Sequence, residues 1–600
     1  MKKIRPALAA ALAATLALTA YPVMASAEDE QFVSPFTGNA GVHGIELLEN
    51  SGNRTNVSVL MGQTASGIKL CSSTTDANCS GDFDFYSVLP KCSASVTIDC
   101  IESVVAKTAN GAQINGELSE YFPTAGVNDF AGSTTESIPG GYTPSVWNLP
   151  GADHSQGTLY YVAVQVQGSR VGGNSTTTPR GVAMSIHPVS IVPTDCDPQF
   201  HGTCLDQYTE SVLNNGRTEV RGASVARDQD LGIRCVGWAE AGRCAKKHAF
   251  PAGITMRVTV RLSVAPSGWL HGRIAAPTAS ITTTNGVTSM VVEASPVRVP
   301  AVAAAEQWST LPSSIQQWFD SNCPDQCGTR NQALFSLPGA QRNAVSTPFS
   351  YAETSFSQLE LWSQHLSDKA SAVPSYWSVR TLSSGEMIGA PDCIKYGTGV
   401  TGIVSTNATL YSEGPPSFDS STKTLNYKVA AMHYEPDGVT ELLGRYDLML
   451  RPDIAQCLYG IDDLAVQSTV NVTAESGQTQ AATTSMTQTS EWFTFSAVNY
   501  THSAPTISVK VAKLRPNLKR GKTIRITSLA KTMKLSIPRG AKVTTSIAKA
   551  SRKRCSLSRG TVLKGVKKGS CTLSISVTPK KTKKVKKPKT VKRTVVVTIR

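Results

Sequence analysis

The residue types best suited to acid–base chemistry are gathered in one short segment of the chain. His433, Glu435 and Asp437 fall within five residues, directly after a strand-like stretch. A general base with an orienting carboxylate needs side chains of these kinds close together. The same segment contains Pro436 and Gly438, which are typical of an ordinary turn. We favour the turn and keep a catalytic role for His433 and Glu435 as the alternative.

Two other segments contain residues of the types found in active sites, but their spacing matches no catalytic motif. Asp153 and His154 follow Trp147 closely, and Trp269 with Arg273 has the residue types that frame a pocket. A tryptophan after a strand is usually buried, so we expect Trp269 to lie in the core. The sequence has no serine-nucleophile elbow, no HExxH helix and no P-loop. We therefore assign no catalytic, cofactor-binding or metal-binding residue.

Residues 76–87 match part of the calcium-binding loop of an EF-hand. Oxygen donors stand at loop positions 1, 3 and 5, and Gly81 stands at position 6. Position 12 is Ser87, where the pattern requires a bidentate glutamate, and no helical pattern flanks the loop. An acidic turn beside a disulfide is the interpretation that we favour.

The elements that would position these residues are predominantly strands. Apolar and polar residues alternate with period two in segments such as 56–60, 159–166, 256–262 and 425–429. Only residues 304–320 show apolar residues at helical spacing, which we attribute to core packing. The sequence thus predicts a mostly β fold, a multidomain β-sandwich-like architecture with one short helical segment near 304–320.

Breaks in composition and pattern divide the chain into five parts. We expect a signal peptide (1–27), an N-terminal acidic β domain (28–191), a second β domain (192–300), a third β-rich domain with a helical start (301–504), and a basic C-terminal β-sandwich (505–600).

The first part has the three features of a secretory signal peptide. Lys2, Lys3 and Arg5 precede an apolar core at 7–20, and a small-x-small cleavage pattern lies at 25–27. An uncleaved anchor is the alternative. No later apolar run reaches the ~20 residues that a membrane span needs, so we expect no transmembrane segment after cleavage.

Fourteen cysteines occur as seven neighbouring pairs along the chain. An even count in an exported protein predicts disulfides, and sequential pairing is the simplest arrangement. Zinc binding is disfavoured because there is no C-x2-C spacing and no nearby pair of histidines. The candidate disulfides are Cys71–Cys79, Cys92–Cys100, Cys196–Cys204, Cys235–Cys244, Cys323–Cys327, Cys393–Cys457 and Cys555–Cys571.

Charge is distributed unevenly along the chain. Residues 501–600 hold 20 Lys and 9 Arg with no Asp or Glu, whereas residues 28–500 hold 26 basic and 43 acidic residues. Clustered cations attract polyanions through their summed field. Residues 501–600 contain no Phe, Tyr or Trp on which bases could stack, and their excess of Lys over Arg favours diffuse attraction.

We therefore expect the basic domain to contact anionic cell-envelope polymers, and we expect no specific binding of nucleic acid. A soluble spacer, or docking of this domain on the acidic part of the same chain, is the alternative. The candidate polyanion-binding residues are Lys580, Lys581, Lys583, Lys584, Lys586, Lys587 and Lys589.

Two segments of this domain resemble a known family. Residues 554–557 (Arg-Cys-Ser-Leu) and 569–573 (Gly-Ser-Cys-Thr-Leu) resemble a bacterial immunoglobulin-like module that ends secreted actinobacterial proteins. The resemblance covers 506–600 and implies a β-sandwich with a surface or spacer role and no catalytic residue. The lysine run departs from such modules in its charge. Residues 100–104, 268–273 and 495–507 resemble segments of uncharacterised secreted actinobacterial proteins. This resemblance covers 28–504 and implies no activity.

The sequence predicts a secreted protein with a structural or binding role. We expect it to be extracellular or associated with the cell envelope. We expect no cofactor, and non-enzymatic function is favoured. The alternative is an extracellular hydrolase acting on glycan or peptide, and a third possibility is a self-assembling component of a surface layer. The ligand and the oligomeric state are left open.

Overall fold

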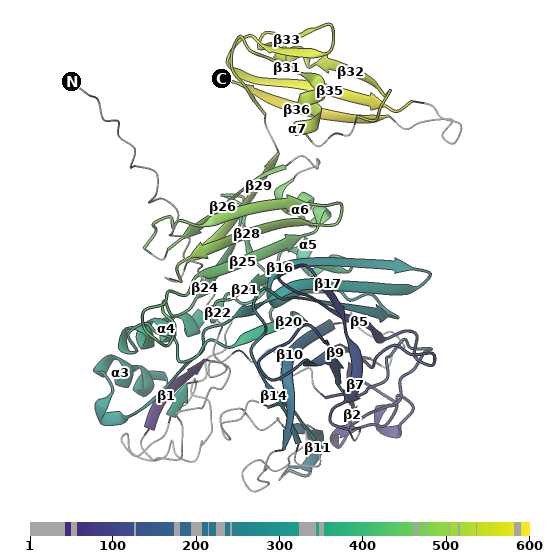
Figure 1. Ribbon diagram of the computed structural model, residues 1–600, viewed down its shortest axis with the longest axis vertical. Helices are drawn as coiled ribbons and strands as arrows, with labels where there is room; N and C mark the ends of the chain where they lie inside the picture. The colour runs from purple at the N-terminus through teal and green to yellow at the C-terminus, as the bar shows by residue number, and fades with distance from the viewer. Residues whose placement is uncertain are drawn as a thin grey trace, which may run out of the picture.

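The structure of the protein is a computed structural model (Figure 1). The signal-peptide region, four of the cysteines (Cys196, Cys204, Cys323 and Cys327) and the lysines from Lys581 to Lys589 lie outside the described residues. The structure describes residues 42–47, 49, 57–124, 126, 128–172, 181–193, 207–213, 215–223, 235–239, 243–322, 344–346, 353–460, 466–474, 476–502, 505–513, 516–533, 535, 537–580 and 590–600.

The fold is mostly β, with several sheets and few short helices, as the sequence predicts. Alternating segments form strands because every second side chain can be buried while its neighbours stay at the surface. Strand β15 is an example, since its burial alternates residue by residue along its whole length. Trp147, Trp269, Trp362 and Trp377 are fully buried and anchor the cores.

One large network of paired strands joins most of the chain. Strands β9, β10, β20, β16, β21, β25 and β28 are successive neighbours, all antiparallel except β16 and β21. Residues of the first three expected domains therefore share hydrogen-bonded strands. The strands of this network are β2 (Val59–Thr64), β3 (Gly67–Leu70), β4 (Phe83–Val88), β5 (Cys100–Lys107), β6 (Gln113–Asn115), β7 (Glu117–Tyr121), β8 (Ser145–Asn148), β9 (Leu159–Arg170), β10 (Gly181–Pro193), β11 (Gln207–Val212), β12 (Thr218–Ala223), β13 (Cys235–Ala239), β14 (Arg243–Lys247), β15 (Thr255–Leu262), β16 (Gly268–Thr284), β17 (Val287–Arg298), β20 (Ser375–Thr381), β21 (Val400–Thr406), β25 (Gly444–Leu450), β27 (Thr483–Gln488) and β28 (Phe493–Tyr500).

Two smaller sheets flank this network. One has the order β18 (Val302–Gln307), β1 (Val42–Leu47), β19 (Ala344–Ser346). The other has the order β22 (Leu410–Tyr411), β24 (Thr424–Ala430), β29 (Thr506–Lys513), β26 (Val466–Thr473), with β23 (Ser417–Asp419) paired to β24.

The helical segment expected near 304–320 is present as α3 (Ser313–Asn322), and strand β18 precedes it. Leu311, Ile315 and Phe319 are buried, so the stripe does pack into a core. The other helices are α4 (Glu353–His365), α5 (Asp392–Lys395), α6 (Pro452–Tyr459) and α7 (Ile526–Thr532). No helix of the described residues is long and apolar enough to cross a bilayer.

Strand β29 belongs to the sheet of the preceding residues. It pairs with β24 on one side and β26 on the other, and Ile507 and Val509 are buried in that core. A domain boundary at residue 505, as the sequence predicts, would therefore place β29 in a different domain from the strands with which it pairs. We call residues 516–600 the basic module and the described residues up to Lys513 the body.

The basic module contains two small sheets with a core of their own. One sheet has the order β30 (Asn517–Leu518), β36 (Val591–Ile599), β35 (Gly569–Thr578), β32 (Lys542–Ile547); the other is β31 (Thr523–Arg525), β34 (Val562–Gly565), β33 (Cys555–Ser558). Leu529, Leu573 and Val595 are fully buried in this core. In Figure 1 the module is the yellow unit beyond β26 and β29, at one end of the molecule.

Five of the seven predicted disulfides are confirmed, all between sequential cysteines. Cys555–Cys571 joins β33 of one module sheet to β35 of the other, so it braces the module across its core. The five are Cys71–Cys79, Cys92–Cys100, Cys235–Cys244, Cys393–Cys457 and Cys555–Cys571.

Candidate functional site

His433 and Glu435 are held by different partners. His433 Nδ1 faces Asp368 Oδ2, and the His433 amide donates to Asp368 Oδ1 at 3.0 Å. Glu435 instead accepts from Arg298, with Nη1 to Oε1 at 2.8 Å and Nη2 to Oε2 at 3.3 Å. The hydrogen bond to Asp368 raises the pKa of His433. The structure therefore places the two predicted residues in two separate ion pairs.

Asp437 has the role of a turn residue, as the favoured interpretation predicts. Its Oδ1 accepts from the amides of Val439 and Thr440, both at 2.8 Å. The hydroxyl of Thr440 and these amides hold the pKa of Asp437 below its ordinary value. A carboxylate committed to three donors of its own turn is a structural group rather than a proton acceptor for a substrate.

His502 is a buried neighbour of the His433–Asp368 pair. Its two ring nitrogens have no hydrogen-bond partner among the described residues. Burial lowers the pKa of His502 to about 3, and the positive charge of His433 acts in the same direction. No pattern in the sequence indicates this pair of histidines, because they lie on segments almost seventy positions apart.

Arg273 is a buried cation whose donors are almost all used within the fold. Its Nε donates to Glu49 Oε2 at 2.6 Å, and its Nη1 donates to the carbonyls of Thr406 and Ala408 at 3.0 and 2.6 Å. The guanidinium also lies 4.7 Å from the ring centroid of Tyr411. These contacts join strand β16 to the segment after β21, so Arg273 has a structural place.

Trp269 lies in the core, as expected, and His271 between it and Arg273 is fully buried. The ring of His271 stacks on Tyr411 with a centroid distance of 4.0 Å. Burial, together with the charges of Arg273 and Arg380, holds the pKa of His271 well below its ordinary value. This histidine is therefore neutral at pH 7.

His154 is buried against a second histidine that no local pattern in the sequence marks. Its ring stacks on His248 at 5.3 Å, and its Nε2 lies 3.1 Å from the carbonyl oxygen of Leu159. Ser190 Oγ lies 2.7 Å from His248 Nε2. A serine bonded to a histidine has the groups of a nucleophile and its base. The same bond also ties β10 to the residue after β14, across an antiparallel ladder.

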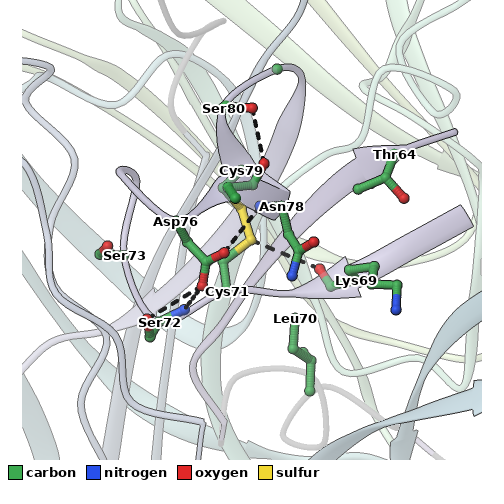
Figure 2. Close-up of a disulfide and its surroundings, with 12 residues drawn as sticks. Thr64, Lys69, Leu70, Cys71, Ser72, Ser73, Asp76, Asn78, Cys79 and Ser80 are labelled. Atoms are coloured by element: carbon green, nitrogen blue, oxygen red, sulfur yellow. Dashed lines mark hydrogen bonds between the residues drawn. A yellow bond between two sulfur atoms is a disulfide. The ribbon is translucent and has the colours of Figure 1, made fainter. Parts of the chain in front are cut away.

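The loop that resembles a calcium site is an acidic turn beside the Cys71–Cys79 disulfide (Figure 2). Asp76 Oδ1 accepts from the amide of Asn78 at 3.0 Å, and its Oδ2 accepts from the amide of Ser72 at 3.3 Å. These amides lower the pKa of Asp76. Among the described residues no group of three or more His, Cys, Asp or Glu side chains is placed to hold a metal ion.

The basic module differs from the body in how its charges are paired. In the body, arginines contact carboxylates, as in Arg170–Glu136 at 2.8 Å and Arg380–Glu386 at 2.6 Å. In the module, no ion pair links any described Lys or Arg side chain to a carboxylate of the module or of the body. Its strands bury apolar residues and leave Lys and Arg outside, as in β34, where Leu563 is buried and Lys564 is exposed.

Of the seven predicted polyanion-binding lysines, the structure describes Lys580, which is exposed next to the end of β35. The chain matches no known protein family and no curated protein. The basic module is β-rich and braced by a disulfide.

Proposed function

We propose that this is a secreted protein of the cell envelope, with a structural or binding role, whose basic module attaches it to anionic surface polymers. One observation carries the proposal: the exposed cations of the described part of the module have no carboxylate partner. A cation that has no carboxylate partner within the protein can attract an external anion, whereas the charge of a paired cation is largely neutralised.

The cysteines support a location outside the cytosol. Five disulfides are formed, and disulfides persist in oxidising compartments. The signal-peptide pattern of residues 1–27 points the same way. Both observations are independent of the charge of the module.

The composition of the module supports diffuse recognition of charge. Residues 516–600 hold 18 Lys and 8 Arg, no Asp or Glu and no aromatic ring, so neither bases nor sugar rings have a stacking surface. Attraction between such a surface and a polyanion is screened beyond about 10 Å at 0.1 M salt. Binding should therefore be strong at low salt and weaken steeply as salt is added.

The experiment uses the full mature chain and isolated bacterial cell walls. Walls before and after chemical removal of their anionic polymers are incubated with the protein over a salt series. The proposal expects binding to intact walls, release by salt, and loss of binding to stripped walls. Equal binding to both kinds of wall, or binding that high salt does not weaken, would overturn it.

A further inference from the structure

Three turns of the basic module meet at one end of its two sheets. The amide of Gly521 donates to the carbonyl of Gly565 at 2.8 Å, and the amide of Gly565 donates back to the carbonyl of Lys522 at 3.1 Å. These bonds fix the turn before β31 against the end of β34. The turn therefore has a defined position relative to the residues that follow β34.

The third turn, at residues 552–554, is joined to the residues after β34 through the carbonyl of Arg554. That oxygen accepts from the amide of Val566 at 2.8 Å and from the amide of Lys567 at 3.1 Å. The next residue, Cys555, is bonded to Cys571, and Arg554 Nη1 donates to the carbonyl of Ser570 at 3.3 Å. The backbone at this end is thus held by hydrogen bonds and by a disulfide.

All the charged side chains of these turns are cations, and all are exposed. We call this group the disulfide end. It consists of Lys519, Arg520, Lys522, Arg552, Lys553, Arg554, Lys567 and Lys568. Eight cations on a rigid frame lose less conformational freedom on binding than the same cations on a flexible chain would, so more of the favourable free energy of their attraction to a ligand is retained.

Strand length separates this end from two other cations of the module, Lys542 and Lys592. Strand β35 begins beside the disulfide end and runs for ten residues, which is about 30 Å at roughly 3.3 Å per residue. Lys542 and Lys592 pair with Thr578 and Ser576, near the far end of that strand. The separation is about four Debye lengths at physiological salt, where the Debye length is about 8 Å. Charge at one end therefore contributes little to binding at the other.

We propose that the disulfide end is the principal contact among the described residues of the module and that its ligand is a linear polymer with phosphate groups in its backbone. This inference rests on the proposed function. The module has no aromatic ring for sugars or bases, so recognition must come from the charge and the N–H donors of its cations. A polymer of phosphate groups carries its charge in the backbone itself, where adjacent cations meet it without ring contacts. The arginines of the disulfide end supply forked donors that fit phosphate oxygens.

The test compares two full-length variants that each lose four exposed cations, one Arg and three Lys. The first is Arg552→Gln/Lys553→Gln/Lys567→Gln/Lys568→Gln, at the disulfide end. The control is Arg539→Gln/Lys531→Gln/Lys542→Gln/Lys592→Gln, elsewhere on the module. Binding to long-chain inorganic polyphosphate and to poly-L-glutamate is measured by titration at two salt concentrations. Circular dichroism checks that both variants are folded.

We expect the first variant to lose polyphosphate affinity by about tenfold or more and to show a shallower salt dependence. The control should lose less than about threefold. Equal losses of affinity in the two variants would show that the disulfide end is not the principal contact. They would not contradict attachment of the module by charge. Wild-type binding of poly-L-glutamate as tight as that of polyphosphate would overturn the preference for a phosphate polymer. Failure of the wild type to bind either polymer would overturn the proposed function itself.

Discussion

The carbonyl oxygen of Arg554 accepts a hydrogen bond from the amide of Lys567 at 3.1 Å, which sets two cationic turns of the basic module side by side. The two residues are thirteen positions apart and flank the β33–β34 hairpin. Cys555, which follows Arg554, is bonded to Cys571, and this disulfide joins the two sheets. Backbone hydrogen bonds and the disulfide therefore hold these cationic turns close together, despite the repulsion between their charges.

Removing this disulfide should affect stability and binding together. The double substitution Cys555→Ser/Cys571→Ser opens a loop of 16 residues, which costs about 3 kcal/mol in the chain-entropy model. Freed from the bridge, the cationic turns should separate, so affinity for polyphosphate should fall severalfold. The matched control is Cys92→Ser/Cys100→Ser in the body, which should lose stability but bind polyphosphate like the wild type. Unchanged binding after loss of Cys555–Cys571 would argue against a braced cationic site.

Arg273 should be far more important for stability than an exposed arginine. Its side chain is 1% exposed and that of its partner Glu49 is 7% exposed. Arg273→Met leaves a buried carboxylate and two carbonyls without their donor, at a cost of about 3–5 kcal/mol. Arg261→Met breaks an ion pair whose arginine is 42% exposed, and it should cost far less because solvent screens such a pair. Urea denaturation of the two variants measures the difference, and equal midpoints would contradict the structural role of Arg273.

His433 should stabilise the fold on the acidic side of neutrality. Its pKa is raised above 6.5, chiefly by the hydrogen bond to Asp368, with Glu441 acting in the same direction. The folded state therefore binds the proton more tightly than the unfolded state does. This stabilisation is complete below pH 6.5 and is lost as pH rises through the folded-state pKa. The free energy of unfolding of His433→Gln should approach that of the wild type as pH is raised from 6 to 9; a gap that widens would be contrary to this.

His502 should have the opposite dependence on pH. Burial lowers its pKa to about 3, so below pH 6.5 the unfolded chain takes up a proton that the folded chain does not. Stability is then lost as pH falls, by about 2 kcal/mol at pH 5. The variant His502→Leu has no group to protonate at this site and should lose less stability than the wild type between pH 7.5 and pH 5. Identical losses in the two proteins would show that His502 does not titrate as proposed.

Features that depend on neighbouring residues are predictable from the sequence. Strands such as β15 follow from strict alternation, and the five disulfides follow from cysteines close in the chain or, for Cys393–Cys457, from sequential pairing. The lack of Asp–Lys or Glu–Arg pairs within the basic module follows from composition, because residues 501–600 contain no Asp or Glu; the lack of pairs between the described residues of the module and the body does not. Asp437 as a turn residue follows from the proline and glycine beside it.

Features that depend on distant residues are not predictable in this way. Asp368 pairs with His433 across 65 positions, and Ser190 meets His248 across 58, with no local pattern at either partner. The alternation of strand β29 is the same as that of the strands that follow, so the sequence assigns it to the basic domain. Only its pairing with β24 and β26 shows where it belongs. Helix α6 has eight residues, too few for a clear helical period.

The most direct test of attachment through the basic module compares the mature chain with a chain that ends at residue 515 and so keeps β29 in its sheet. Both are passed over immobilised polyphosphate while salt is raised from about 50 to 500 mM. The account predicts that the full chain is retained at low salt, with a binding constant that falls steeply and linearly on a log–log plot, and that the shortened chain flows through. Equal retention of the two chains, or retention of the full chain that salt does not reduce, would contradict it.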